Sequence, residues 1–278
     1  MPNVVALARE KMDISAIVVH VDASTYATAR LAHAVALACA LPATLVGLLP
    51  QRGLHPDAGF FADCESSRVA FEAATAGAPI AVDWRVGEGT PLEAMQCEGR
   101  LADLIIVSQP CAGDGHRLVD TRPFVEGTIL EAGPPVLVIP LTDDAAPTQV
   151  WPYARVMVAW SGTRESARAL RDALPILRRA QHVALACCIP FSRHRRTDMA
   201  PASYALTWLA RRGIRACLIG LTSDAHASLG KAFLATARTA RTDLLVCGAP
   251  ARDEAVGKLG GIAGTVLEKS PIPTLFAR

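Results

Sequence analysis

Short apolar runs alternate with amphipathic segments along the whole chain. The first run covers residues 16–21, and the segment that follows, residues 25–40, has small apolar side chains at helical spacing. Continuous apolar runs of this length are typical of parallel strands that are covered on both faces. The alternation therefore predicts βαβ units, in which right-handed crossovers place helices on both sides of a parallel sheet.

The same pattern predicts the other elements. In the first half we expect strands at 16–21, 44–49, 79–86, 104–107 and 136–139 and helices at 25–40, 62–76, 91–100 and 122–132. In the second half we expect strands at 155–160, 182–189, 214–219, 244–247 and 273–277, helices at 165–179, 204–211 and 228–240, and a last helix around Val266 that ends before Pro271. Asp22-Ala-Ser is expected to cap the first helix, because short polar side chains accept hydrogen bonds from free helix N–H groups.

The chain contains one unit twice. IVVHVDAST from residue 17 aligns with VMVAWSGTR from residue 156, an offset of 139. DLIIVSQP from residue 103 aligns with DLLVCGAP from residue 243, an offset of 140, and PVLVIP from residue 135 aligns with PTLFAR from residue 273, an offset of 138. Three matches in order at nearly one offset predict two domains, 1–141 and 152–278, joined by a polar linker at 142–151.

The composition supports a large core. Hydrophobic residues make up 51% of the 278 residues and charged residues 19%. No apolar run reaches the roughly 18–20 residues that span a bilayer, and the first residues lack a signal-peptide pattern, so we expect a cytoplasmic protein. The eight cysteines include no C-x-x-C pair, which favours buried reduced thiols over a redox or metal site.

The two halves carry opposite charge. Residues 1–150 hold 9 Lys/Arg and 18 Asp/Glu, a net charge of −9, whereas residues 151–278 hold 19 and 8, a net charge of +11. Three interpretations remain open: the halves attract each other, the second half prefers anionic ligands, or the charge is scattered over the surface without a partner.

Ligands of open α/β sheets bind beyond the carboxyl ends of the strands, where free helix N–H groups attract phosphate. Three loops of each copy meet this description: the first turn (22–24 and 161–163), the turn before the third helix (87–90 and 223–228) and the loop after the fourth strand (108–120 and 248–261).

With these loops, the sequence resembles the universal stress protein family, most of all its tandem, two-domain bacterial type. The resemblance covers nearly the whole chain, twice. It implies two flavodoxin-like (adenine-nucleotide alpha-hydrolase-like), doubly wound domains with five parallel strands each, which form a pseudo-dimer through their fifth strands. It also implies an ATP site with the pattern G-x2-G-x9-G-[S/T] after the fourth strand and an aspartate in the first turn that contacts the nucleoside.

The second copy matches this pattern in part. Gly248 takes the place of the first glycine, Ala251 stands at the second, and Gly260-Gly261 replaces the final Gly-[S/T] after eight residues instead of nine. Pro250 removes one N–H group from the loop, and the acidic pair 253–254 brings negative charge near a phosphate site. The resemblance nominates as nucleotide-binding residues Ser161, Gly162, Thr163, Gly248, Ala251, Gly260, Gly261 and Ile262, with Asp22, Ala23 and Ser24 of the first copy.

The first copy departs further from the pattern. Ser108 and Cys111 stand at the two glycine positions and Arg122-Pro123 at the Gly-[S/T] position, although Asp22 is retained. The alternative interpretation of both loops is structural, with glycines that serve only tight turns and close helix packing.

We therefore expect a non-enzymatic stress-response protein that binds a ligand or a partner protein, with ATP and its Mg²⁺ as the candidate cofactor. The alternatives are a weak nucleotide hydrolase and a carrier of a small apolar ligand. Gly260-Gly261 lacks the hydroxyl that could hold a metal, which counts against catalysis, and we nominate no catalytic or metal-binding residue. Homodimerisation is compatible with the sequence. No membrane partner is expected. No nucleic-acid partner is expected either, because no aromatic residues interleave with the basic run 193–196.

Overall fold

The computed structural model describes residues 14–51, 58–111, 121–141, 151–188, 200–221, 226–250 and 259–278. The strands are β1 Ala16–His20, β2 Thr44–Pro50, β3 Val82–Gly87, β4 Leu104–Ser108, β5 Val136–Ile139, β6 Arg155–Trp160, β7 His182–Cys188, β8 Ala216–Leu221, β9 Leu244–Gly248 and β10 Thr274–Ala277. The helices are α1 Ala27–Ala40, α2 Ala58–Thr75, α3 Pro91–Gly99, α4 Arg122–Glu131, α5 Arg164–Asp172, α6 Leu174–Leu177, α7 Ala200–Ala210, α8 His226–Thr239 and α9 Gly261–Lys269.

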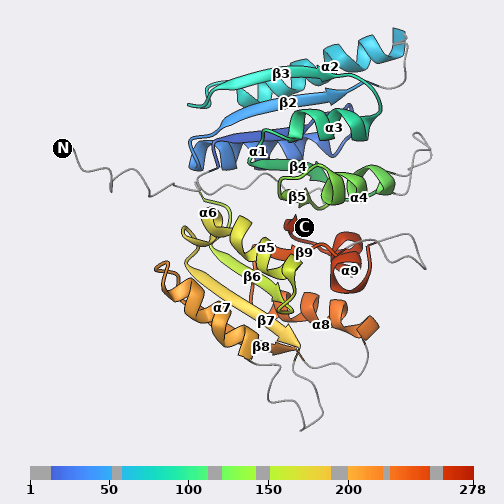
Figure 1. Ribbon diagram of the computed structural model, residues 1–278. Helices are drawn as coiled ribbons and strands as arrows, with labels where there is room; N and C mark the ends of the chain where they lie inside the picture. Colours follow the sequence, from blue (N-terminus) through green and yellow to red (C-terminus); the bar gives the residue numbers. More distant parts are fainter. Residues whose placement is uncertain are drawn as a thin grey trace, which may run out of the picture.

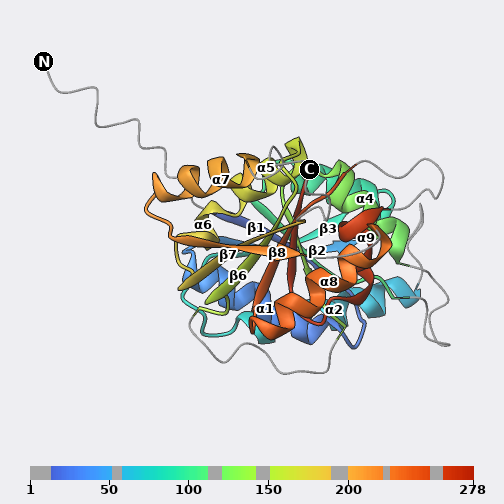
Figure 2. The same ribbon diagram turned by 90° about the horizontal axis from the view of Figure 1, so that it is seen from below.

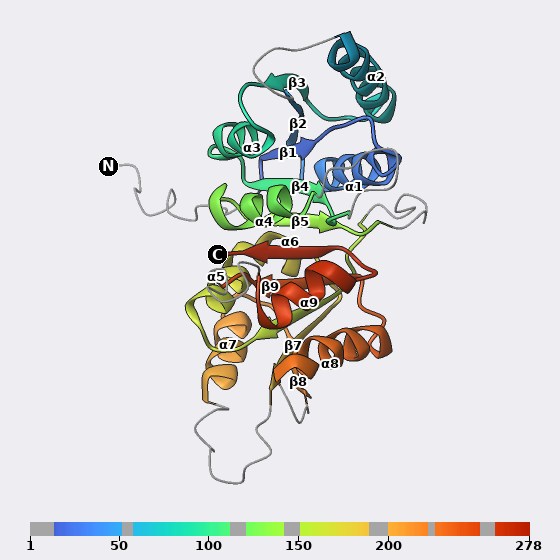
Figure 3. The same cartoon turned by 90° about the vertical axis from the view of Figure 1, so that its right-hand side faces the viewer.

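All described strands join in one sheet in the order β3-β2-β1-β4-β5-β10-β9-β6-β7-β8. The first half of the chain forms one end of the sheet and the second half the other (Figure 1). Every neighbouring pair is parallel except β5 and β10, which run antiparallel with Leu137 opposite Leu275 in the middle of the molecule (Figure 3). The expected doubly wound α/β fold and the pairing of the fifth strands are both confirmed.

Helices cover both faces of this sheet, as the view from below shows (Figure 2). On one face α1, α2, α5, α6 and α7 enclose a core that includes Leu31, Phe71 and Leu209. On the other face α3, α4, α8 and α9 enclose a second core that includes Met95 and Phe233. Each core runs through both halves. Because β5 and β10 pair with each other, neither strand leaves an exposed sheet edge.

The aspartate that opens the repeated DLIIV and DLLVC segments has a structural role in both copies. The carboxylate of Asp103 accepts hydrogen bonds from Ser15 N at 2.8 Å and from Ala16 N at 3.0 Å. Asp243 accepts one from Arg155 N at 2.8 Å. Each carboxylate thus satisfies backbone N–H groups where the neighbouring strand begins.

Two local expectations were wrong. The segment 165–179 forms two helices, because Pro175 has no N–H group to continue the first one and α6 starts anew at Leu174. The residue at the N-cap of α1 is Tyr26, without a side-chain cap, since Asp22 and Ser24 bond to other groups. By contrast, Thr90 opens α3 with a reciprocal capping box.

The cysteines are less uniformly buried than expected. Cys187 and Cys247 are buried, but Cys97 and Cys217 are exposed, and burial raises the pKa of the Cys247 thiol to about 12. None of the helices in the described part of the chain has the length and the apolar character that a membrane span needs.

Candidate functional site

The candidate loops lie where the strand order reverses in each half. In the first half β1 is flanked by β2 and β4, and in the second half β6 is flanked by β7 and β9. The first turn and the loop after the fourth strand therefore follow neighbouring parallel strands and share one end of the sheet. This is the position at which open α/β sheets bind ligands. The two copies fill it in different ways.

In the first half, the side chain of Arg30 occupies the centre of this position. Arg30 lies on α1 and is only 1% exposed. Its Nη2 donates to Asp22 Oδ1 at 2.9 Å, its Nη1 to Ser108 Oγ at 2.6 Å and its Nε to the carbonyl oxygen of His20 at 2.6 Å. One guanidinium thus joins the ends of β1 and β4.

Asp22 is consequently a paired carboxylate. Ser24 donates to its Oδ1 from both N, at 3.1 Å, and Oγ, at 2.6 Å, and His20 Nδ1 lies 3.9 Å from Oδ2. Burial raises the pKa of the Asp22 carboxyl, but Arg30, His20 and Ser24 together outweigh this effect and hold the pKa well below its usual range. The side chain that the resemblance assigns to the nucleoside is engaged within the protein, and Ala23 beside it is exposed.

The rest of the first-copy loop is also closed. The N–H of Cys111, at the second glycine position, donates to Thr121 Oγ1 at 2.8 Å, and Thr121 N donates to the Cys111 carbonyl at 3.3 Å. Arg122, at the Gly-[S/T] position, forms ion pairs with Glu126 at 3.3 Å and with Glu268 of α9 at 2.9 Å. These bonds engage the Cys111 N–H and the Arg122 guanidinium, which are groups that a bound phosphate would need.

In the second half, the first turn is tight and exposed. Gly162 has a φ of +73°, which favours glycine. Thr163 is the N-cap of α5, and its Oγ1 accepts from Ser166 N at 3.3 Å and lies 3.0 Å from Ser161 Oγ. The counterpart of Arg30 is Ala169, which is fully buried, so the second half has no equivalent of the Arg30 guanidinium on its first helix.

Gly248 has a packing role. A Cβ atom at this position would lie 2.5 Å from the backbone carbonyl carbon of Glu165 and 2.6 Å from Ser166 N. The missing side chain therefore lets the first turn of α5 approach the end of β9. In the first copy the same position is Ser108, whose hydroxyl accepts from Arg30.

Gly260 and Gly261 start α9 with an open first turn. Gly260 is the N-cap, with extended backbone (φ −94°, ψ 175°) and no side-chain cap, and Gly261 has a φ of +61°. No residue in the described part of the chain accepts a hydrogen bond from the N–H of Ile262 or Ala263. Such a helix start attracts anions through its free N–H groups and the helix dipole.

Several nominated or neighbouring residues lie outside the described residues. They are Ala251, the acidic pair 253–254 and the basic run 193–196. Within the described part of the chain, no group of three or more His, Cys, Asp or Glu residues could hold a metal ion. Gly260 and Gly261 have no side chain that could supply an oxygen ligand to Mg²⁺.

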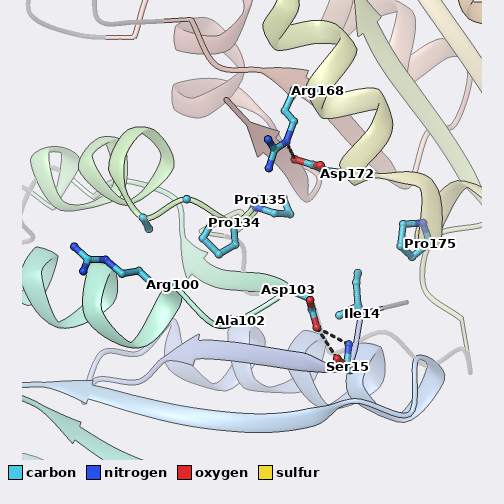
Figure 4. Close-up of a pocket in the computed structure, with 12 residues that line it drawn as sticks. Ile14, Ser15, Arg100, Ala102, Asp103, Pro134, Pro135, Arg168, Asp172 and Pro175 are labelled. Carbon is cyan, nitrogen blue, oxygen red and sulfur yellow. Dashed lines mark hydrogen bonds and ion pairs between the residues drawn. The ribbon is translucent and has the colours of Figure 1, made fainter. Parts of the chain in front are cut away.

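A cavity of about 630 Å³ opens at the opposite end of the first-half strands. Ser15, Asp103 and Pro135 line it from the starts of β1, β4 and β5, while Arg168 and Asp172 of α5 face them from the second half (Figure 4). Arg168 Nε donates to Asp172 at 2.7 Å. The carrier alternative expects an apolar gap at the candidate loops, whereas this cavity has charged walls and lies away from those loops.

Polar contacts bind the two halves around the paired fifth strands. Gln109 Nε2, just after β4, donates to the carbonyl oxygen of Leu267 in α9 at 2.8 Å. Arg278 Nη1 donates to the Leu130 carbonyl at 2.9 Å. The Arg122–Glu268 ion pair joins α4 to α9 directly, and the other two contacts also link one half to the other.

Sequence reasoning missed Arg30. The signal was present, because Arg30 shares the buried face of the predicted helix with Leu31, Ala34 and Leu37 and follows Asp22 by eight residues. A lone arginine on an apolar helix face needs a buried partner. Asp22, the nearest carboxylate in the sequence, was already a candidate site residue.

Comparisons with known proteins agree with this architecture. Neither a protein-family model nor a curated protein sequence matches the chain. Among solved structures, a universal stress protein from Archaeoglobus fulgidus DSM 4304 has a TM-score of 0.70 at 15% identity, over 95% of this chain and 98% of that one.

Two Pseudomonas aeruginosa proteins are also similar over the full length. A functionally unknown protein from strain PAO1 has a TM-score of 0.62 at 19% identity, covering 96% of this chain and 93% of its own. A putative universal stress protein from strain UCBPP-PA14 has a TM-score of 0.60 at 20% identity, covering 96% and 94%. The chain therefore has the two-unit fold of universal stress proteins.

Proposed function

We propose that the chain is a tandem universal stress protein, with domains at 1–141 and 152–278, that acts in the cytoplasm as a non-enzymatic stress-response protein and binds an adenine nucleotide, ATP foremost, through its second domain. The observation that carries this proposal is the difference between the two copies. Arg30 fills the sheet end of the first domain, whereas the first turn of α9 in the second domain keeps N–H groups without a described acceptor.

The expected binding is weak and has a stoichiometry of one nucleotide per chain. Phosphate would meet the N–H groups of the α9 start beside the turn at 161–163, since β6 and β9 are neighbours. The nucleoside would find Ser161 where the family pattern has an aspartate. Hydrolysis is not part of the proposal, because neither Gly260 nor Gly261 offers a side chain that holds a metal near the phosphates.

Calorimetric titration of the full chain with Mg-ATP tests the proposal, with Gly260→Asp as the decisive variant. Aspartate suits the extended backbone of an N-cap and stabilises helices there. Its carboxylate would take the free N–H groups and repel phosphate. We expect the variant to lose the binding heat while keeping or raising its melting temperature.

Gly260→Asn is the matched control, because asparagine caps the helix without adding a charge. We expect it to weaken binding less than Gly260→Asp does. No heat at millimolar Mg-ATP would remove nucleotide binding from the proposal. Unchanged affinity in Gly260→Asp would show that the nucleotide binds elsewhere, and two sites per chain would contradict the role assigned to Arg30.

A further inference from the structure

The outer strand β8 (Ala216–Leu221) ends the sheet in the second half. Among the described strands it pairs only with β7. One edge of its backbone therefore presents N–H and C=O groups that no described strand pairs. Cys217 and Gly220 of this strand are exposed, and the preceding Arg215 is exposed as well. An open edge of this kind is a template for a further strand.

The other outer strand, β3, is protected in a way that β8 is not. Asp83 and Arg85 lie on β3 and pair at 2.8 Å, and Arg85 also pairs with Glu98 of α3 at 2.6 Å. Charged side chains on an edge strand discourage the addition of another strand. The sequence of β8, ACLIGL, has no charged residue and no proline. The contrast between the two ends of one sheet points to β8 as the edge that is open to pairing.

The surroundings of β8 are basic. It is covered on one face by α7 and on the other by α8. The described residues 200–221 and 226–242 contain no aspartate or glutamate. The same residues contain six basic side chains, Arg211, Arg212, Arg215, Lys231, Arg238 and Arg241. This local excess of positive charge contributes to the net charge of +11 of residues 151–278.

The outward face of α7 adds an aromatic surface beside this edge. Tyr204 is 75% exposed, and the guanidinium of Arg212 lies 3.7 Å from the ring centroid of Trp208. Trp208 itself is half-buried. Tyrosine, tryptophan and arginine at a surface are the residue types that contribute most to protein–protein contacts.

From these observations we propose that β8 and the exposed face of α7 form a docking surface for an extended, acidic polypeptide segment of a partner protein, which adds to the sheet as a strand. The open backbone edge supplies the pairing, and the basic side chains that flank it select acidic residues. A second copy of the chain fits this surface less well, because pairing β8 with β8 would bring two domains of charge +11 together. A nucleic acid would make no use of the open N–H and C=O groups.

The test uses the full chain and a fluorescein-labelled peptide of alternating glutamate and valine. Fluorescence anisotropy should show binding that weakens with added salt, and hydrogen exchange should show new protection of the β8 amides. The charge reversal Arg212→Glu with Arg215→Glu should weaken binding at least tenfold. Arg171→Glu with Arg178→Glu is the matched control, because these exposed residues lie on or next to α5 and α6 and the net charge change is the same.

Three further comparisons separate strand addition from simple charge attraction. Cys217→Asp should abolish binding by placing a charge on the edge, while Cys217→Ser should not. A peptide of the same charge with proline at regular intervals should bind far more weakly, because it cannot pair along its length. Equal binding of the proline peptide, or no protection of β8, would refute the proposal.

The competing occupants are tested in the same experiments. If a single-stranded oligonucleotide of equal charge binds more tightly than the peptide and protects the same strand, the surface is a nucleic-acid site and the proposal fails. If sedimentation shows a dimer that Cys217→Asp dissociates, the occupant is a second copy and the proposal fails likewise.

Discussion

The buried Arg30 makes a sharp prediction about stability. Replacing it by methionine keeps most of the side-chain volume but removes the charge and three hydrogen bonds, to Asp22, Ser108 and the carbonyl of His20. The variant leaves the Asp22 carboxylate without its cation. We expect the N-terminal half to be clearly destabilised at neutral pH.

The magnitude follows from the burial of the pair. Breaking a buried ion pair by removing one partner typically costs about 3–5 kcal/mol, because the other charge stays buried and unpaired. The side chain of Asp22 is 22% exposed and keeps its bonds from Ser24, so partial hydration lowers the cost. We expect the free energy of unfolding to fall by about 3 kcal/mol. For a protein of this size, each kcal/mol lost lowers the melting temperature by roughly 2–4 °C.

Urea denaturation followed by circular dichroism measures this loss, and a double-mutant cycle with Asp22→Asn isolates the pair. Asp22→Asn removes the unpaired charge, so the double variant should recover part of the stability that Arg30→Met loses. The pH dependence has a defined sign. Because the folded pKa of Asp22 is depressed, its ionised form stabilises the protein above the ordinary value near 3.8 and this contribution disappears as pH falls below that value. The deficit of Arg30→Met should therefore shrink in acid.

Two results would refute the reasoning. A loss below about 1 kcal/mol for Arg30→Met would mean that the guanidinium adds no more than an exposed ion pair does. A double variant as unstable as the sum of the two single variants would mean that Arg30 and Asp22 are not coupled.

Three other predictions follow from the packing. Gly248→Ala should cost about 3 kcal/mol in denaturant unfolding, because its Cβ must displace the first turn of α5; a neutral effect would show that α5 can move. Burial lowers the pKa of His33 to about 4, so unfolding free energy should fall by up to about 3 kcal/mol as pH drops from 6.5 toward 4, and His33→Gln should flatten this slope. Cys97 and Cys217 should react with a thiol reagent in the native state and Cys247 should not, which peptide mapping checks; early labelling of Cys247 would contradict its burial.

The repeat and the alternation of strands and helices could be predicted from the sequence, because both are patterns of residues along the chain. A run such as DLLVC is typical of a covered strand, and its copy at Asp103 indicates the length of the unit. The positions of the strands along the chain follow from these patterns, as does the pairing of the fifth strands once the family resemblance is admitted. Asp103 and Asp243 were visible in the sequence as repeated residues. Their role as acceptors of hydrogen bonds from backbone N–H groups was not.

The split of the helix at 165–179 had a local cause that the periodicity hid. The apolar positions around Leu170 and Ile176 continue at helical spacing through Pro175, so the pattern alone predicts one helix. The missing N–H of the proline ends the first helix, and the chain restarts with its apolar residues still facing the core.

The sequence by itself determined the fold and the two copies, and it nominated the candidate loops. Only the tertiary structure showed that Arg30 fills the candidate position of the first copy. Arg30 reaches Ser108 across 78 positions of sequence, and Gly248 is small because the backbone at Glu165 approaches it, 83 positions earlier in the chain. Such contacts depend on which strands become neighbours. The local pattern of polar and apolar residues does not show which distant segments are brought together in this way.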